Sequence, residues 1–127
     1  MAEEIPRISP SELAPLLLKD STAVQVVDVR EEDFEGGHIP GCRNVPAFEF
    51  ESQVDSLAEE FAGKDLLLVF HCWHSSQRGP KCARHMVECL ANHPERKCKV
   101  AILEGGFCRW QYEFAREDDC TQYIAGG

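Results

Sequence analysis

The sequence has few basic residues and no long apolar run. Its 13 lysines and arginines stand against 22 acidic residues, which gives a formal net charge of −9. Such a charge disfavours non-specific binding to nucleic acid or to an anionic membrane surface, because both carry charge of the same sign. The longest aliphatic run, residues 66–70, is far too short to cross a bilayer. We therefore expect neither a nucleic-acid partner nor a membrane span.

Two further patterns are missing, that of a signal peptide and that of a disulfide framework. Residues 1–7 are acidic and lack the basic flank and apolar stretch of a secretory signal. The seven cysteines are an odd number without the regular spacing of a secreted disulfide scaffold. A chain of 127 residues does not need cross-links to bury a core. We expect a single cytoplasmic domain over residues 1–127, with free thiols and a loosely ordered tail after about residue 116.

Strand and helix patterns alternate along the chain. Apolar and β-branched segments predict strands at residues 23–29, 43–46, 66–70 and 99–103. Capping residues and helical spacing predict helices at residues 10–19, 31–35, 49–62 and 80–90, followed by a final short helix that carries Phe107 and Trp110. The alternation indicates an α/β domain with a parallel sheet, and the most apolar strand, 66–70, is expected at its centre.

The loop that follows the central strand, residues 71–79, is predicted to carry the chemistry. It places Cys72 at the strand end and Arg78 six positions later, just before a helix start. Ligands of such sheets bind where the chain leaves the carboxyl end of a central strand. A loop this short must turn its backbone N–H groups inward, and with the positive end of the helix these groups form an anion site. The same field favours the nucleophilic thiolate of Cys72, while the fork of Arg78 can bind two oxygens of a tetrahedral oxyanion.

Cys72 and Arg78 are accordingly the predicted catalytic residues. The predicted oxyanion-binding loop consists of Trp73, His74, Ser75, Ser76, Gln77 and Arg78. Hydroxyl groups of the two serines could add hydrogen bonds to the anion or to the sulfur. The alternative is a buried free cysteine beside a surface arginine. Placement argues against it, because only this cysteine has an arginine at that offset and lies between the most apolar strand and a helix started by proline.

Three segments of the chain resemble the rhodanese family. Residues 26–30 with 35–41 look like the first signature of that family, and residues 103–107 with Trp110 look like its closing segment. With the loop, the resemblance covers about residues 7–115. It implies a rhodanese-like α/β fold, with a central five-stranded, mainly parallel sheet and helices on both faces.

The length of the loop resembles one branch of this family. Sulfurtransferases have a loop shorter by one residue, so sulfur transfer is the weaker alternative. The spacing of Cys72 and Arg78 is similar to that of the cell-cycle dual-specificity phosphatases and of the eukaryotic arsenate and antimonate reductases, including those of trypanosomatid parasites. The first resemblance implies a phosphoprotein substrate. The second implies a small oxyanion substrate, with glutathione and a glutaredoxin as the reductant and no bound cofactor.

The loop also departs from the phosphatases at two positions. They carry glutamates directly after the cysteine and directly before the arginine, where this sequence has Trp73 and Gln77. Release of an alkoxide or phenoxide benefits from a proton donor, for which only His74 is a candidate substitute in the loop. Reduction of arsenate needs a thiolate, an oxyanion cradle and a second thiol, and makes less demand on an acid. We therefore expect a thiol-dependent arsenate reductase that could also reduce antimonate, with a tyrosine or dual-specificity phosphatase as the alternative.

Several other residues were weighed for roles outside the loop. Cys82, ten residues after Cys72, is either a resolving thiol or a plain core cysteine. With His85 and Cys89 it shares one helical face, but no close cysteine pair is present, and we expect no metal site. By the family comparison, Asp28 and Arg30 are expected to form a structural pair.

Overall fold

Strands and helices alternate along the chain, as the sequence predicts. The computed structural model describes residues 4–20, 22–34, 37–61, 64–95 and 98–114. The strands are β1 (Arg7–Ile8), β2 (Val24–Asp28), β3 (Arg43–Asn44), β4 (Leu67–His71) and β5 (Lys99–Leu103). The helices are α1 (Pro10–Lys19), α2 (Ala47–Phe61), α3 (Arg78–Ala91) and α4 (Gly106–Phe114), with a 3₁₀ turn, η1 (Glu32–Phe34). The tail expected after residue 116 lies outside the described residues.

The strands form one five-stranded sheet in the order β1-β5-β4-β2-β3, and all four pairings are parallel. The prediction of a mainly parallel sheet is therefore confirmed. Strand β4 lies at the centre, as its continuous apolar sequence predicts, because a strand covered by helices on both faces has no polar face to present.

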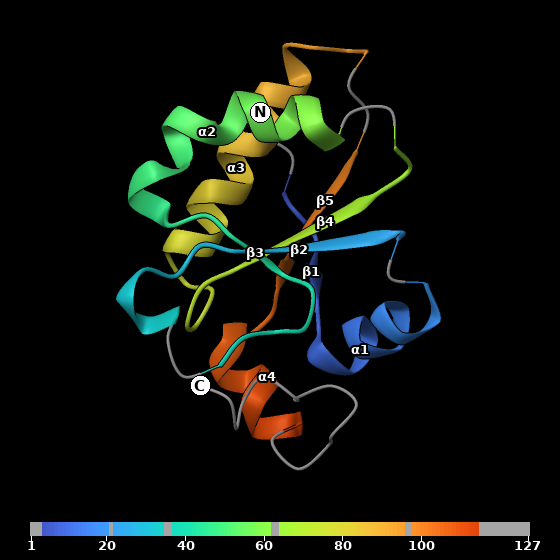
Figure 1. Ribbon diagram of the computed structural model, residues 1–127, viewed down its shortest axis with the longest axis vertical. Coiled ribbons are helices and arrows are strands. Elements are labelled where there is room, and N and C mark those ends of the chain that lie inside the picture. The colour runs from blue at the N-terminus through green and yellow to red at the C-terminus, as the bar shows by residue number, and fades with distance from the viewer. Residues whose placement is uncertain (1–3, 21, 35–36, 62–63, 96–97, 115–127) are drawn as a thin grey trace.

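Two helices cover each face of the sheet (Figure 1). On one face, α2 and α3 pack a core that includes Phe50, Leu57 and Met86. On the other face, α1 and α4 pack a second core around Leu13 and Trp110, both fully buried. The two cores hold both faces of β4 away from water. The loop at the carboxyl end of this strand therefore starts from a rigid base.

The first helix begins as its sequence predicts. The Ser9 hydroxyl accepts a hydrogen bond from the Glu12 amide, and the Glu12 carboxylate accepts one from the Ser9 amide. Helix α3, in contrast, begins at Arg78, two residues before the predicted start at Pro80. Proline is tolerated in a first helical turn, where its missing N–H would have no partner within the helix. The catalytic arginine thus belongs to the helix.

Strand β1 was not predicted, because two residues contain no periodic pattern. It exists through its pairing with β5, in which Ile102 donates to the Pro6 carbonyl and Glu104 donates to the Ile8 carbonyl. This pairing fixes the side chain of Arg7 at the same edge of the sheet as the loop. Among the described residues, no helix has the length and apolar character needed to span a membrane.

Candidate active site

Cys72 lies directly after β4, at the floor of a pocket. Its side chain is 3% exposed, and its Sγ accepts a hydrogen bond of 3.2 Å from the Gly79 amide in the first turn of α3. The pocket has a volume of about 660 Å³ and is lined by Asp33, Cys72, Trp73, His74, Ser76, Gln77 and Arg78. The structure thus brings together the predicted nucleophile, the predicted arginine and four other loop residues.

The backbone of the loop is held by the amino end of α4. The Phe107 amide donates to the Cys72 carbonyl at 3.0 Å, and the Cys108 amide donates to the Trp73 carbonyl at 2.9 Å. Because a trans peptide is planar, its C=O and N–H point in opposite directions. Tying these two carbonyls to α4 turns the amides of Trp73 and His74 away from that helix. They are then available on the side from which an anion approaches.

Close contact between the loop and α4 requires glycine at residue 106. A Cβ atom on Gly106, whose φ is +62°, would lie 2.4 Å from the Trp73 carbonyl oxygen and 2.6 Å from that of Cys72. Neither oxygen belongs to a flexible side chain, so a larger residue would displace the loop. The expected close approach of backbone at this glycine pair is therefore present, and its partner is the catalytic loop.

Ser75 takes no part in the lining of the pocket. Its side chain is 1% exposed, its Oγ has no hydrogen-bond partner, and its φ of +58° is in the left-handed region. The predicted hydroxyl donor at this position therefore faces the interior, whereas Ser76 lines the pocket. The contribution of Ser75 comes from its backbone, because a left-handed residue among right-handed neighbours makes successive amides converge on one point.

Arg78 is paired with two carboxylates of the turn around η1. Its Nη2 lies 2.8 Å from Asp33 Oδ2, its Nη1 lies 3.1 Å from Asp33 Oδ1, and the same Nη1 lies 3.4 Å from Glu31 Oε1. Hydrogen bonding to Asp33 raises the pKa of Arg78, and the guanidinium holds the pKa of Asp33 below its usual range. An oxyanion must therefore compete with Asp33 for the fork.

Asp28 and Arg30 form the buried pair that the sequence predicts. The guanidinium of Arg30 contacts both carboxylate oxygens of Asp28, and both side chains are almost fully buried. Arg30 also donates to the carbonyl of Asp33 at 2.9 Å and lies over the ring of Phe107, 4.2 Å from its centroid. The pair therefore has a structural role that reaches the site, because it holds the turn that presents Asp33 to Arg78.

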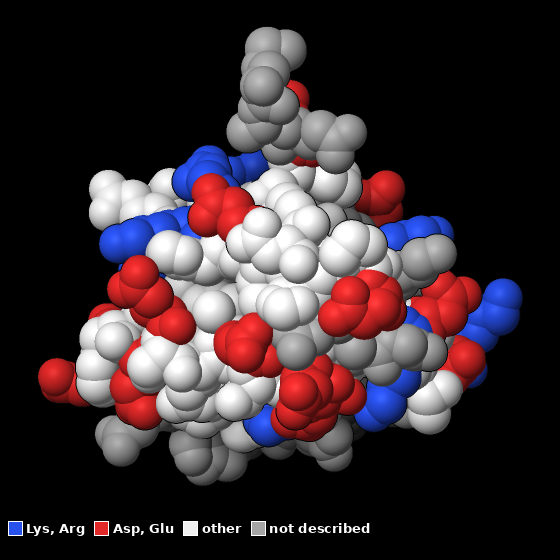
Figure 2. Space-filling view, turned by 90° about the horizontal axis from the view of Figure 1, so that it is seen from above, with Lys and Arg blue, Asp and Glu red and all other residues white. Residues whose placement is uncertain are grey.

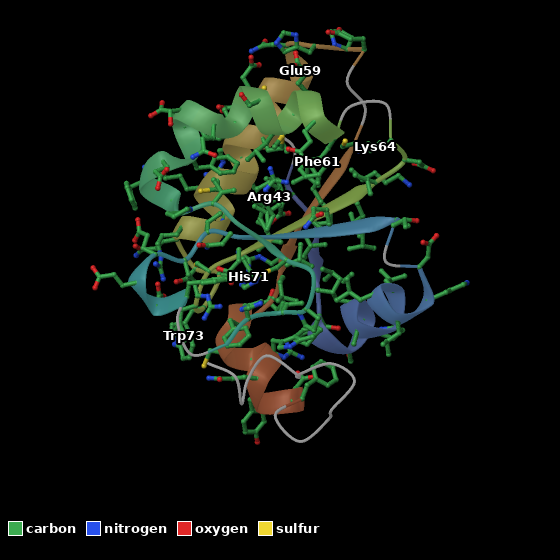
Figure 3. The ribbon with its side chains drawn as sticks, in the orientation of Figure 1. Arg43, Glu59, Phe61, Lys64, His71 and Trp73 are labelled. Carbon is green, nitrogen blue, oxygen red and sulfur yellow. The ribbon has the colours of Figure 1, made fainter. Side chains whose placement is uncertain are left out.

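His71 and Trp73 flank the nucleophile and differ in exposure (Figure 3). His71 is fully buried, and its Nδ1 donates to the Cys72 carbonyl at 3.0 Å, since that oxygen can only accept. Burial lowers the pKa of His71. Trp73 is half-buried and packs on Phe107 while it lines the pocket, so it forms a wall where the phosphatases carry an acid.

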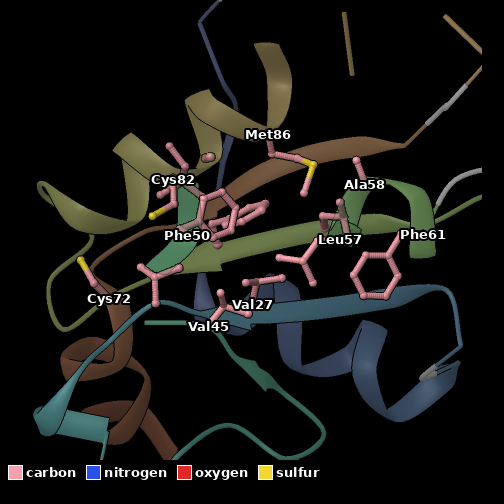
Figure 4. Packing of buried hydrophobic residues seen from close by; sticks show 14 of the residues in the cluster. Val27, Val45, Phe50, Leu57, Ala58, Phe61, Cys72, Cys82 and Met86 are labelled. Carbon is pink, nitrogen blue, oxygen red and sulfur yellow. The ribbon is translucent and has the colours of Figure 1, made fainter. Parts of the chain in front are cut away.

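Cys82 lies in the first turns of α3 and faces the core beside Phe50 (Figure 4). It lines a neighbouring groove of about 290 Å³, which also contains Arg78, Lys81 and His85, and does not line the pocket of Cys72. Burial raises the pKa of its thiol to about 12. A resolving role for Cys82 stays a prediction, and it would require this thiol to become exposed.

Positive charge at the site is local. The face shown in Figure 2 carries several groups of acidic side chains, with basic side chains between them. A chain with a net charge of −9 gives an anion little long-range attraction. Binding of an oxyanion must therefore depend on the loop amides and on Arg78.

The sequence alone did not identify Asp33, Glu31 or Arg7 as neighbours of the loop. Asp33 and Glu31 are separated from Arg78 by 45 and 47 positions, and Arg7 is separated from Ser75 by 68. No spacing within one element connects such residues. Only the proximity of residues 31–35 to the first family signature could have drawn attention to the two acids.

The sequence matches the family described as rhodanese-like domain over residues 9–113. The dual specificity phosphatase ibp1 of Schizosaccharomyces pombe is 32% identical, with 91% of this chain and 95% of that protein covered. Arsenate reductase 2.2 of Oryza sativa is 34% identical, with 87% of this chain and 85% of that protein covered. Relatives of both predicted classes are thus present at similar distance.

Two solved structures share the fold. A yeast protein tyrosine phosphatase of the rhodanese family superimposes with a TM-score of 0.82 at 26% identity, covering 95% of this chain and 94% of that one. The As-Sb reductase of Leishmania major superimposes with a TM-score of 0.76 at 27% identity, covering 93% of this chain and 85% of that one. These likenesses support an enzyme of oxyanion chemistry and do not choose between reduction and phosphate hydrolysis.

Proposed function

The chain belongs to the rhodanese-like domain family, and from this premise we propose that it is a thiol-dependent arsenate reductase with Cys72 as nucleophile. The observation that carries the proposal is the ionised state of Asp33. Among the described residues, Asp33 is the only acidic side chain that lines the pocket. Arg78 keeps its pKa low, so at neutral pH this carboxylate has no proton to give. A reaction without an organic leaving group suits such a site best.

In the proposed reaction, the Cys72 thiolate attacks arsenic while the loop amides and Arg78 hold the oxygens. One oxygen of arsenate leaves as water. An external thiol, for which we propose glutathione, then attacks the Cys72–arsenic adduct. The two thiols become one disulfide and lose two electrons, and arsenic gains both and leaves as arsenite. A glutaredoxin with further glutathione restores the Cys72 thiol. Antimonate has the same oxidation state and is a second candidate substrate.

The alternative function is hydrolysis of phosphotyrosine or phosphothreonine. It is supported by the phosphatases among the relatives and by His74, which is exposed and lines the pocket. Sulfur transfer is the weaker alternative, because the loop is longer than the sulfurtransferase loop by one residue.

The experiment that tests the proposal is a pair of assays on the purified protein. One measures arsenite formed from arsenate with glutathione and a glutaredoxin, and the other measures phosphate released from phosphotyrosine and phosphothreonine peptides. We expect thiol-dependent arsenite and slow release from peptides. Efficient dephosphorylation of phosphothreonine without any arsenite would overturn the assignment.

A double substitution, Trp73→Glu with Gln77→Glu, is expected to favour the phosphatase reaction. It restores the two loop carboxylates, and only phosphoester hydrolysis has an alkoxide to protonate, so release from phosphothreonine peptides should rise at least about tenfold relative to arsenate reduction. The measurement is the ratio of the two kcat/KM values. The matched control is Trp73→Gln, which has nearly the size of glutamate without its acid. An equal rise in that control would mean that removal of the Trp73 ring, and no proton donor, caused the change.

The replacement Asp33→Asn is expected to lower the KM for arsenate by about fivefold. It frees Arg78 from a competing carboxylate and removes one negative charge from the pocket, which is worth about 1 kcal/mol at such a site. Steady-state kinetics at neutral pH measure the change. Glu31→Gln is the matched control, because its contact with Arg78 is longer and its effect should be smaller. A higher KM in Asp33→Asn would show that Asp33 orients the arginine rather than competes for it.

A further inference from the structure

Arg7 on the edge strand reaches the middle of the catalytic loop. Its Nη1 donates to the Ser75 carbonyl at 3.3 Å, and it also lies 3.6 Å from Glu104 Oε1. The position of Arg7 is fixed by backbone pairing, since the residues on either side of it accept hydrogen bonds from β5. An arginine outside the loop therefore contacts the one described residue of the loop whose side chain is buried and without a hydrogen-bond partner.

We infer that Arg7 is a positioning residue for the oxyanion-binding loop. The Ser75 carbonyl and the Ser76 amide belong to one planar peptide and point in opposite directions. By holding this carbonyl outward, Arg7 directs the Ser76 amide toward the pocket that the Ser76 side chain lines. The α4 amides do the same for Trp73 and His74, so three amides of the loop are oriented from outside it.

The left-handed backbone of Ser75 explains why such a contact is needed. A residue with a side chain loses about 1 kcal/mol in this region and stays there only when its surroundings hold it. The Ser75 hydroxyl gives no hydrogen bond that would hold it. The bond from Arg7 stabilises the left-handed conformation, and the converging amides depend on that conformation. Loss of Arg7 would allow the peptide between Ser75 and Ser76 to rotate, and the loop would lose an anion donor.

The test is the affinity of arsenate for the Cys72→Ser protein, in which no turnover occurs, measured by calorimetry. Adding Arg7→Ala should raise the Kd about fivefold to tenfold, the usual effect of one lost hydrogen bond. Adding Arg7→Lys, which keeps a donor, should restore part of the affinity. The control Glu104→Gln removes the ion pair of Arg7 and leaves its bond to Ser75, so the Kd should change by less than about twofold.

Two further measurements separate positioning from other effects. A long-range effect of the Arg7 charge would disappear at about 0.5 M salt, whereas an effect of loop geometry should persist there. In the protein that retains Cys72, Arg7→Ala should also slow alkylation of Cys72 by iodoacetamide, while the thermal unfolding midpoint changes little. A merely structural role would lower the midpoint and leave both the Kd and the alkylation rate of the folded protein unchanged.

The inference rests on the oxyanion-binding role of the loop in the proposed function, and the outcomes distinguish the two. If the Cys72→Ser protein with Arg7 intact binds no arsenate, the proposed reductase and this inference both fall. If that protein binds arsenate and Arg7→Ala binds it equally well, or if the difference vanishes at high salt, only the positioning role is overturned. Should Arg7→Ala fail to fold, Arg7→Gln is compared in its place by the same measurements.

Discussion

Replacing Cys72 with serine is expected to lower oxyanion turnover by at least about 10⁴-fold while the fold is retained. A serine hydroxyl is not ionised at neutral pH and cannot replace the thiolate as nucleophile. Its oxygen can still accept the hydrogen bond that the Gly79 amide gives to Sγ, so the first turn of α3 should keep its place. Arsenite production measures the first effect, and circular dichroism with thermal unfolding measures the second.

The matched control for this substitution is Cys98→Ser. Cys98 is another half-buried to buried thiol position with a hydrogen bond, in this case to the Phe61 carbonyl at 3.1 Å, and a serine can keep that bond. It lies on the strand side of α2, away from the loop, and turnover should stay near that of the parent protein. Substantial activity in a folded Cys72→Ser protein would mean that another thiol attacks the oxyanion.

The replacement Arg78→Lys is expected to reduce kcat/KM for arsenate about 100-fold. Lysine keeps the charge and can still pair with Asp33, but it loses the planar fork that binds two oxygens of the substrate at once. The pair with Asp33 is half-exposed, so the free energy of unfolding should change by less than about 1 kcal/mol. Steady-state kinetics and chemical denaturation of the same preparation measure the two effects.

Arg43 provides the matched control for Arg78. Its guanidinium also binds one carboxylate at two points, with contacts of 2.7 and 2.8 Å to Glu60, but it lies on β3 away from the pocket (Figure 3). Arg43→Lys therefore makes the same chemical change in a similar ion pair and should leave turnover unaltered. If Arg78→Lys were as active as Arg43→Lys, the guanidinium of Arg78 would not be a ligand of the oxyanion.

The sequence predicted the elements whose residues interact locally. The capping box at Ser9 and Glu12 predicted the start of α1, and the continuous apolar run of β4 predicted the central strand. It also predicted that Cys72 and Arg78 would meet in one pocket, because six positions of chain cannot carry them far apart between a strand end and a helix start. These outcomes depend on neighbouring residues, which are readable from spacing.

The orientation of the loop was decided only by the tertiary structure. The Cys72 and Trp73 carbonyls are tied by α4, the Ser75 carbonyl by Arg7, and the fork of Arg78 by Asp33. Each of these contacts joins segments that come together only because the sheet orders its strands β1-β5-β4-β2, which brings the chain ends of four strands to one edge. Periodicity reports which face of an element is buried, but not which distant element will cover it. The sequence therefore determined which residues form the site, whereas the packing of distant elements determined the direction in which the loop amides and the arginine point.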